Sequence, residues 1–223
     1  TRTGWITSGP KTLALEQEIR KFTGTDAVIC VNSWTSGAML MLRWFGVGPG
    51  DEVIIPAYTY AATALAALNL GARPVMVDVG EDFNINPENI GPAITERTKA
   101  IIPVDLGGWP CNYEKIYQVI NEPANISKFV PASDRQKQLG RILVLADAAH
   151  SLGGEYKNLP VGKAADVTIF SLHSVKNITT GEGGAICLSL PSTFEPQDEY
   201  KFLKVLSLNG QTKSALEKNQ PGG

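Results

Sequence analysis

The sequence predicts an α/β domain in which a mostly parallel sheet lies between two layers of helices. Two observations lead to this fold class. Seven short runs along the chain are apolar throughout rather than alternating, which is typical of strands buried on both faces. Stretches with helical periodicity separate many of these runs, as expected when crossover helices join parallel strands. The expected structure therefore has three layers.

The expected strands are short and rich in β-branched and other apolar residues, with turn-forming residues between many of them. They cover residues 27–31, 52–56, 74–79, 100–104, 142–147, 166–171 and 185–189.

The expected helices lie between these strands, before the first and after the last. They cover residues 10–22, 36–45, 60–70, 87–94, 113–121 and 199–208. The first has Ser8 in its N-cap region and Pro10 near its first position, where a missing N–H costs little. Residues 122–140 are polar and contain proline, so we interpret them as a surface excursion rather than a domain boundary.

Composition excludes several classes of function. The 223 residues are 43% hydrophobic and carry a formal net charge of -2, so no basic field exists to hold nucleic acid or an anionic membrane. The three cysteines form no close pair, which argues against a disulfide framework or a metal site. No apolar run is long enough for a signal core or a membrane span. We expect a cytoplasmic protein.

Candidate functional residues follow three of the expected strands. In a parallel sheet, ligands gather where the strands end. Asp147 and His150 follow one strand, and Ser171 and Lys176 follow another. A third strand runs into the Ser/Thr-rich turn at residues 33–37, just before a helix, where free backbone N–H groups favour a phosphate.

Each of these features alone has an ordinary explanation. A strand-end aspartate often caps a helix, a Ser/Thr turn is a good N-cap, and a single lysine is usually solvated. Together they are the parts that hold pyridoxal 5'-phosphate. A lysine forms a Schiff base, a carboxylate pairs with the pyridinium nitrogen, and hydroxyls and amides bind the phosphate.

Five blocks resemble, in the same order, the landmarks of the DegT-type sugar aminotransferases. These blocks are GWITSGP, GPGDEVIIPAYTY, ITERTKAIIPVDLGG, LADAAHSLGGEYKNLPVG and FSLHSVKNITTGEGG. The resemblance covers nearly the whole chain and implies the large domain of a fold-type-I pyridoxal phosphate enzyme. Such an enzyme transfers an amino group from an amino acid, here expected to be glutamate, to a nucleotide-linked keto-sugar. It also implies a role in cell-surface polysaccharide biosynthesis and a homodimer with shared active sites.

The resemblance implies roles for individual residues. Lys176 would carry the cofactor as a Schiff base and move protons, and Asp147 would pair with the ring nitrogen. His150 would lie near the phenolic oxygen, with Tyr60 stacked on one face of the ring and Ala149 on the other. The residues implied to hold the phosphate are Thr35, Ser36 and Ser171.

Two positions bear on specificity within the family. The residue before Thr35 is usually small, and here it is Trp34, so we expect either a narrower phosphate cradle or an indole that points outward beside the sugar. His173 favours amination at C4 of the sugar, because C3 enzymes tend to have tyrosine there. Lys176 disfavours the dehydratase branch of the family, in which histidine replaces it.

We expect residues 1–223 to form the large, cofactor-binding domain, truncated before a smaller C-terminal domain. The alternative is a non-catalytic sensor or partner-binding module with the same fold. Such a module would not need to keep the set of Asp147, His150, Ser171 and Lys176. No GxGxxG follows a strand and no GxSxG is present, which argues against a dinucleotide-dependent oxidoreductase and a hydrolase.

Overall fold

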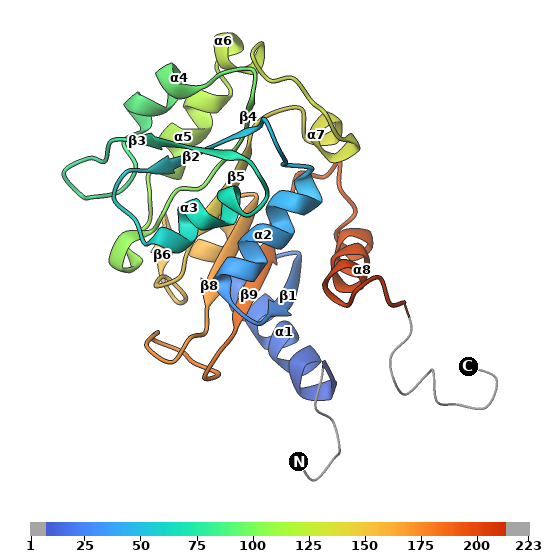
Figure 1. Cartoon of the computed structure of the whole chain (residues 1–223). Helices are drawn as coiled ribbons and strands as arrows, with labels where there is room; N and C mark the ends of the chain where they lie inside the picture. The colour runs from blue at the N-terminus through green and yellow to red at the C-terminus, as the bar shows by residue number, and fades with distance from the viewer. Residues whose placement is uncertain (1–7, 213–223) are drawn as a thin grey trace.

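The computed structural model describes residues 8–212, which form a seven-stranded sheet with helices on both faces (Figure 1). The strand order is β1-β9-β8-β5-β4-β2-β3. The strands are β1 (Ala27–Val31), β2 (Glu52–Pro56), β3 (Arg73–Val77), β4 (Thr98–Ile101), β5 (Leu143–Asp147), β8 (Val167–Ser171) and β9 (Gly184–Leu188). Strands β3, β2, β4, β5 and β8 pair in parallel, whereas β9 is antiparallel to β8 and β1. The expected mostly parallel sheet is confirmed.

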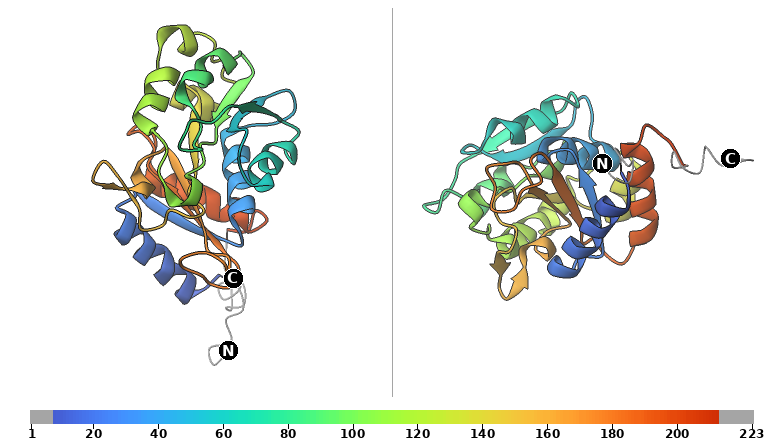
Figure 2. Two further views of the ribbon diagram at one scale, coloured as in Figure 1. Left: turned by 90° about the vertical axis from the view of Figure 1, so that its left-hand side faces the viewer. Right: turned by 90° about the horizontal axis from the view of Figure 1, so that it is seen from below.

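Helices α2 (Trp34–Phe45) and α3 (Ala61–Leu68) cover one face of the sheet (Figure 2). Helices α1 (Pro10–Thr23), α4 (Ile90–Ala93) and α5 (Tyr113–Ile120) cover the other. The division follows from the right-handedness of crossovers between parallel strands. From β1 to β3 the chain moves toward one edge of the sheet, and from β3 to β5 it returns, so the crossover helices α2 and α3 fall on one face and α4 and α5 on the other.

Several boundaries differ from the expected ones. Helix α1 has Gly9 rather than Ser8 at its N-cap, and α2 starts two residues early because Ser33 caps it. The expected helix over 87–94 divides into a 3-10 turn, η1 (Pro87–Asn89), followed by α4. A hairpin of two-residue strands, β6 (Glu155–Tyr156) and β7 (Leu159–Pro160), was not expected, because so short a strand carries no periodic pattern. Two further 3-10 turns are η2 (Leu106–Gly108) and η3 (Val161–Lys163).

The polar segment 122–140 contains two short helices, α6 (Pro123–Ile126) and α7 (Asp134–Leu139). The side chain of Gln136 is fully buried, and its Nε2 donates to the carbonyl of Phe45 at 3.0 Å. Ser133 Oγ donates to the same carbonyl at 2.8 Å. The segment therefore fastens the C-terminal end of α2, whose last carbonyls have no partner within the helix.

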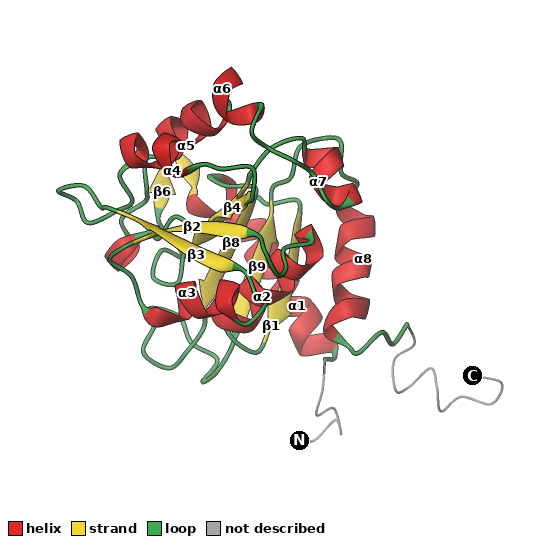
Figure 3. Cartoon of the chain, turned by 45° about the horizontal axis from the view of Figure 1, so that its top comes forward, coloured by secondary structure: helices red, strands yellow, loops and turns green. Residues whose placement is uncertain are grey.

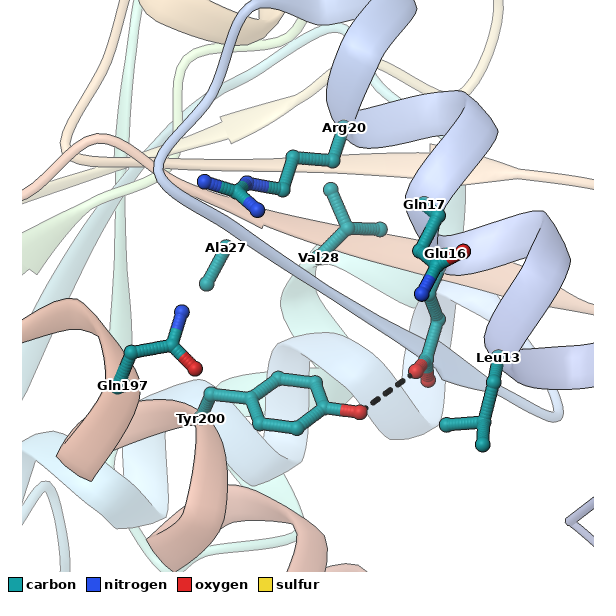
Figure 4. Close-up of a pocket in the computed structure, with 8 residues that line it drawn as sticks. All are labelled: Leu13, Glu16, Gln17, Arg20, Ala27, Val28, Gln197 and Tyr200. Atoms are coloured by element: carbon teal, nitrogen blue, oxygen red, sulfur yellow. Dashed lines mark hydrogen bonds between the residues drawn. The ribbon is translucent and has the colours of Figure 1, made fainter.

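Helix α8 (Pro196–Ser207) packs against β1 and α2 and lies beside α7 (Figure 3). The side chain of Glu16 on α1 is buried and accepts hydrogen bonds from Tyr200 Oη at 2.8 Å and Lys204 Nζ at 2.9 Å. It also accepts one from the backbone N–H of Cys30 at 2.9 Å. This carboxylate ties α8 to the edge of the sheet, beside a small cavity of about 180 Å³ (Figure 4).

Two chain ends fall outside this description: residues 1–7, which hold most of the GWITSGP block, and residues 213–223. Within residues 8–212, no helix is long and apolar enough to cross a membrane.

Buried carboxylates at the amino ends of the strands have arginine partners. Glu52, which starts β2, is 1% exposed and accepts hydrogen bonds from Arg73, Arg97 and Thr95 at 2.6, 2.9 and 2.6 Å. Burial opposes its ionisation, but these hydrogen bonds outweigh burial and lower the pKa of Glu52 to about 2. Asp166, just before β8, is held by two bonds of 2.7 Å from Arg141.

We predict that Glu52→Gln lowers the free energy of unfolding at neutral pH by about 1–3 kcal/mol, because the arginines lose their buried partner. A carboxyl whose folded pKa lies below its ordinary value stabilises the fold above about pH 4.5, and this stability is lost as the pH falls toward 2. Denaturant titrations across that range should show a flatter pH dependence for Glu52→Gln. The exposed Glu81→Gln is the control, and equal profiles for the two variants would contradict the assignment.

Candidate active site

A cavity of about 480 Å³ opens at the edge of the sheet where the parallel strands end. Its walls come from the segments that follow β1, β2, β4, β5 and β8. Seven of the eight sequence-predicted site residues line it: Thr35, Tyr60, Asp147, Ala149, His150, Ser171 and Lys176. Its volume is in the range typical of small-molecule sites.

Asp147 closes β5, and its side chain is 6% exposed. One carboxylate oxygen accepts a hydrogen bond from Thr63 Oγ1 at 3.0 Å, and the other accepts from the backbone N–H of Ala149 at 3.3 Å. None of the cations in the described part of the chain forms a salt bridge with it. Asp147 therefore differs from Glu52 and Asp166, the buried acids at the opposite edge.

Burial without a partner cation changes the acidity of Asp147. Desolvation raises the pKa of this carboxyl to about 7, and the nearby charge of Asp105 adds to the rise. The hydrogen bonds from Thr63 and Ala149 and the charge of Lys176 oppose the rise without cancelling it. A cationic group bound against Asp147 would restore its ordinary ionisation.

Lys176 and His150 meet across the cavity. Lys176 Nζ lies 2.7 Å from His150 Nε2. Burial and the positive charge of Lys176 both lower the pKa of His150, so its ring is neutral at pH 7 and Nε2 accepts a hydrogen bond from Nζ. The contact with His150 holds the amine of Lys176 in place. Because the Lys176 side chain is only half-buried, this amine is still open to a ligand.

The N-terminus of α2 forms one wall of the cavity. Ser33 Oγ caps the backbone N–H of Ser36 at 3.1 Å, which leaves the N–H groups of Trp34 and Thr35 without helical partners. The backbone of Gly184 approaches this turn so closely that a Cβ there would lie 2.8 to 2.9 Å from Ser33 and Trp34 atoms. Only glycine fits at residue 184.

Ser36 is the predicted site residue that does not line this cavity. Its hydroxyl bonds to Ser33 and Asn32, and it lines the neighbouring cavity. Trp34 also differs from one of the two expectations, because its indole is buried rather than turned outward. The Tyr60 ring is 82% exposed at the cavity rim and is free to stack on a ligand.

Sequence reasoning missed the residues that support Asp147. Thr63 is fully buried, and its hydroxyl bonds to both Thr59 and Asp147. Asp105 follows β4, and its backbone N–H donates to the carbonyl of Asp147 at 3.0 Å. Its carboxylate accepts from Ser151 Oγ at 3.0 Å, which fixes the turn after Asp147. The rule that selected Asp147, an acid at a strand end, would also have selected Asp105.

The residues present fit pyridoxal phosphate. A buried carboxylate without a cation suits a protonated ring nitrogen, a held lysine amine suits a carbonyl carbon, and a helix N-terminus with nearby hydroxyls suits a phosphate.

Comparison with known proteins shows the family of this chain. The model of the DegT/DnrJ/EryC1/StrS aminotransferase family matches residues 1–128 and 130–220. The spore coat polysaccharide biosynthesis protein SpsC of Bacillus subtilis is 35% identical over 221 residues, 99% of this chain and 51% of SpsC. The UDP-4-amino-4-deoxy-L-arabinose–oxoglutarate aminotransferase of Shewanella sediminis is 44% identical over 184 residues, 82% of this chain and 43% of that protein.

A solved structure of Spr1654 from Streptococcus pneumoniae, assigned as a sugar aminotransferase, superposes in its PMP-form with a TM-score of 0.93 and 45% identity. The match covers 99% of this chain and 55% of Spr1654, and the PLP-form of the same protein gives a TM-score of 0.92. This chain thus spans about half the length of the relatives it matches.

We predict that Asp105→Asn lowers the pKa of Asp147, because it removes a neighbouring negative charge. The Asp105 carboxylate accepts three hydrogen bonds, from Cys111 N–H, Tyr113 Oη and Ser151 Oγ, and an amide cannot keep all three. The variant should therefore also lose about 1–3 kcal/mol of unfolding free energy. Carboxyl ¹³C chemical shifts followed against pH would report the titration of Asp147.

Asp166→Asn is the matched control, because it changes an equally buried aspartate at the opposite edge of the sheet. It should destabilise the fold without moving the Asp147 titration. An unchanged Asp147 titration in Asp105→Asn would refute the electrostatic coupling.

Proposed function

Because this chain belongs to the DegT/DnrJ/EryC1/StrS aminotransferase family, we propose that it forms the cofactor-binding part of a sugar aminotransferase. The enzyme uses pyridoxal phosphate to move an amino group from an amino acid to a nucleotide-linked keto-sugar. The observation that carries this proposal is the convergence of Lys176, His150 and Asp147 on one cavity at the carboxyl edge of the sheet.

When bound, pyridoxal phosphate supplies the carbonyl that exchanges amino groups and the ring that takes up electrons. Lys176 supplies the amine that holds the cofactor and, once free, moves a proton at Nζ. His150 accepts a hydrogen bond from that amine and orients it, since its ring is neutral at pH 7. Asp147 keeps the proton on the ring nitrogen, and Thr63 and Ala149 hold the carboxylate in position.

The remaining predicted site residues bind and orient. Tyr60 and Ala149 line the cavity and would enclose the ring. Thr35 and Ser171 offer hydroxyls to the phosphate, together with the free N–H groups at the start of α2. Ser36 contributes through the hydrogen bonds that shape the turn at Ser33 and Asn32.

For the substrates, we propose glutamate as the amino donor and C4 as the sugar carbon that is aminated. The name of the Shewanella relative contains oxoglutarate, the keto acid that glutamate becomes, and a 4-amino-4-deoxy sugar. His173, which favoured C4 on sequence grounds, lines the cavity, and its Nε2 lies 3.4 Å from Glu182 Oε1. The name of SpsC supports a role in making surface polysaccharide.

In the same proposal the enzyme is a cytoplasmic homodimer whose active sites are shared between subunits. Exposed aromatic side chains form a patch near the cavity. The rings of Tyr58 and Phe83 are in tilted contact, with centroids 5.6 Å apart, and Asn84 beside Phe83 donates to the carbonyl of the exposed Trp109. A second copy of the chain would cover this apolar surface. Cytoplasmic conditions suit the free thiols of Cys30, Cys111 and Cys187.

We predict that Lys176→Ala abolishes amino transfer while the protein stays folded, because a half-buried surface lysine is not needed for the core. In the intact wild-type protein, borohydride should fix pyridoxal phosphate covalently to Lys176, as peptide mass spectrometry would show. Glutamate alone should then shift the absorption of the bound cofactor. Addition of a nucleotide-linked 4-keto-sugar should reverse that shift faster than its 3-keto isomer does.

The control is Lys115→Ala, which removes an exposed lysine on α5 and should leave turnover unchanged. Turnover by a folded Lys176→Ala protein near the wild-type rate would refute the role of Lys176. A cofactor shift with glutamate but no response to either keto-sugar would refute the substrate class alone.

A further inference from the structure

The indole N–H of Trp34 is buried without a hydrogen-bond partner. The side chain is 5% exposed, and its Nε1 is the one buried side-chain nitrogen or oxygen in residues 8–212 that lacks a partner. A buried donor left unpaired costs stability, and native proteins rarely keep one without a reason. A tryptophan is also unexpected here, because the resemblance implies a small residue before Thr35.

The position of Trp34 points to the reason. It is the first residue of α2 and lines the cavity that also contains Lys176 and Asp147. Side chains on a helix lean toward its N-terminus, so the side chain of a first residue extends past the end of the helix. The indole therefore lies at the end of α2 that bears the free N–H groups of Trp34 and Thr35.

The donors at this end of the cavity select the kind of group that they bind. Indole N–H donates only, and so do the two backbone N–H groups, which together suit a group rich in acceptor oxygens. Under the proposed function, the Asp147 carboxylate would hold the ring nitrogen of the cofactor, and His150 would lie near its phenolic oxygen. The phosphate remains, with an anionic charge that the N-terminus of α2 also favours.

We propose that the Trp34 indole N–H is a phosphate-binding donor of this site, added to the backbone and hydroxyl donors at the start of α2. This inference rests on the proposed function, since it takes the phosphate to be that of pyridoxal phosphate. The unpaired donor then destabilises the empty site, and a hydrogen bond to the phosphate stabilises the filled one.

Trp34→Phe tests the proposal, because it keeps an aromatic ring and removes the N–H. Dissociation constants for pyridoxal phosphate and for pyridoxal, which lacks the phosphate, are measured on the intact protein by equilibrium dialysis. Trp34→Phe should weaken binding of pyridoxal phosphate about tenfold or more, as expected for a lost bond to a charged acceptor. Binding of pyridoxal should change less than about twofold.

Trp44→Phe is the matched control on the same helix. Trp44 is equally buried, but its Nε1 donates to Glu199 and it does not line the cavity. Trp44→Phe should leave both dissociation constants unchanged. Without cofactor it should destabilise the fold more than Trp34→Phe does, because it breaks an existing hydrogen bond.

The outcomes separate this inference from the proposed function. Wild-type protein that binds neither compound would overturn both. If the wild type binds both compounds and Trp34→Phe weakens the binding of both equally, the indole contacts the pyridine ring rather than the phosphate. If Trp34→Phe weakens the binding of neither, the indole has no role in binding. Either of these two results overturns the inference and leaves the proposed function standing.

If Trp34→Phe does not fold, ¹⁵N–¹H spectra of the wild-type protein decide instead, with the Trp34 indole signal identified by elimination using variants of the other tryptophans. The indole proton should lie further downfield with pyridoxal phosphate than with pyridoxal. The same position with both compounds would overturn the inference.

Discussion

The site depends on one buried carboxylate that has no cation of its own. At the amino ends of the strands, Glu52 and Asp166 are equally buried, but arginines neutralise them. At the carboxyl end of β5, Asp147 receives only two neutral hydrogen bonds, and burial raises its pKa to about 7. The buried acids Glu52 and Asp166 are thus neutralised at the amino edge of the sheet, whereas Asp147 has no cation at the carboxyl edge, where the ligand is expected.

The unpaired indole N–H of Trp34 is a second deficit in the same cavity. Asp147 lacks a cation, and the Trp34 indole lacks a hydrogen-bond acceptor. Pyridoxal phosphate carries a cation in its protonated ring nitrogen and acceptors in its phosphate. Elsewhere the molecule satisfies buried polar groups carefully, as Glu16 and Gln136 show with bonds to helices and strands far away in sequence. Both of these deficits lie in one cavity, as is typical of a binding site, where stability is given up for function.

Much of this arrangement could be predicted from sequence, for a physical reason. Apolar runs locate buried strands, and parallel strands bring their last residues to one edge, so Asp147 and Ser171 meet although they are distant in the chain. Hydrogen bonds between segments distant in the chain leave no comparable pattern in the sequence. In the sequence, Thr63 cannot be told from any other helical threonine, because its hydrogen bond to Asp147 forms only in the fold. The polar segment around Gln136 was expected to be a surface excursion, because the carbonyl that Gln136 contacts at the end of α2 leaves no pattern in the sequence. The close approach of Gly184 to the start of α2 is likewise encoded by no local pattern.

The most direct test compares the unfolding free energies of wild type and Asp147→Asn across pH, with and without pyridoxal phosphate. Because the folded pKa of Asp147 lies above its ordinary value of 3.8, the carboxyl destabilises the cofactor-free fold as the pH rises from about 4 through about 7. Asp147→Asn should therefore match wild type near pH 4 and exceed it by the order of 4 kcal/mol above pH 7. Added cofactor should reverse that order. A cofactor-free Asn variant that is no more stable than wild type at high pH would contradict the account.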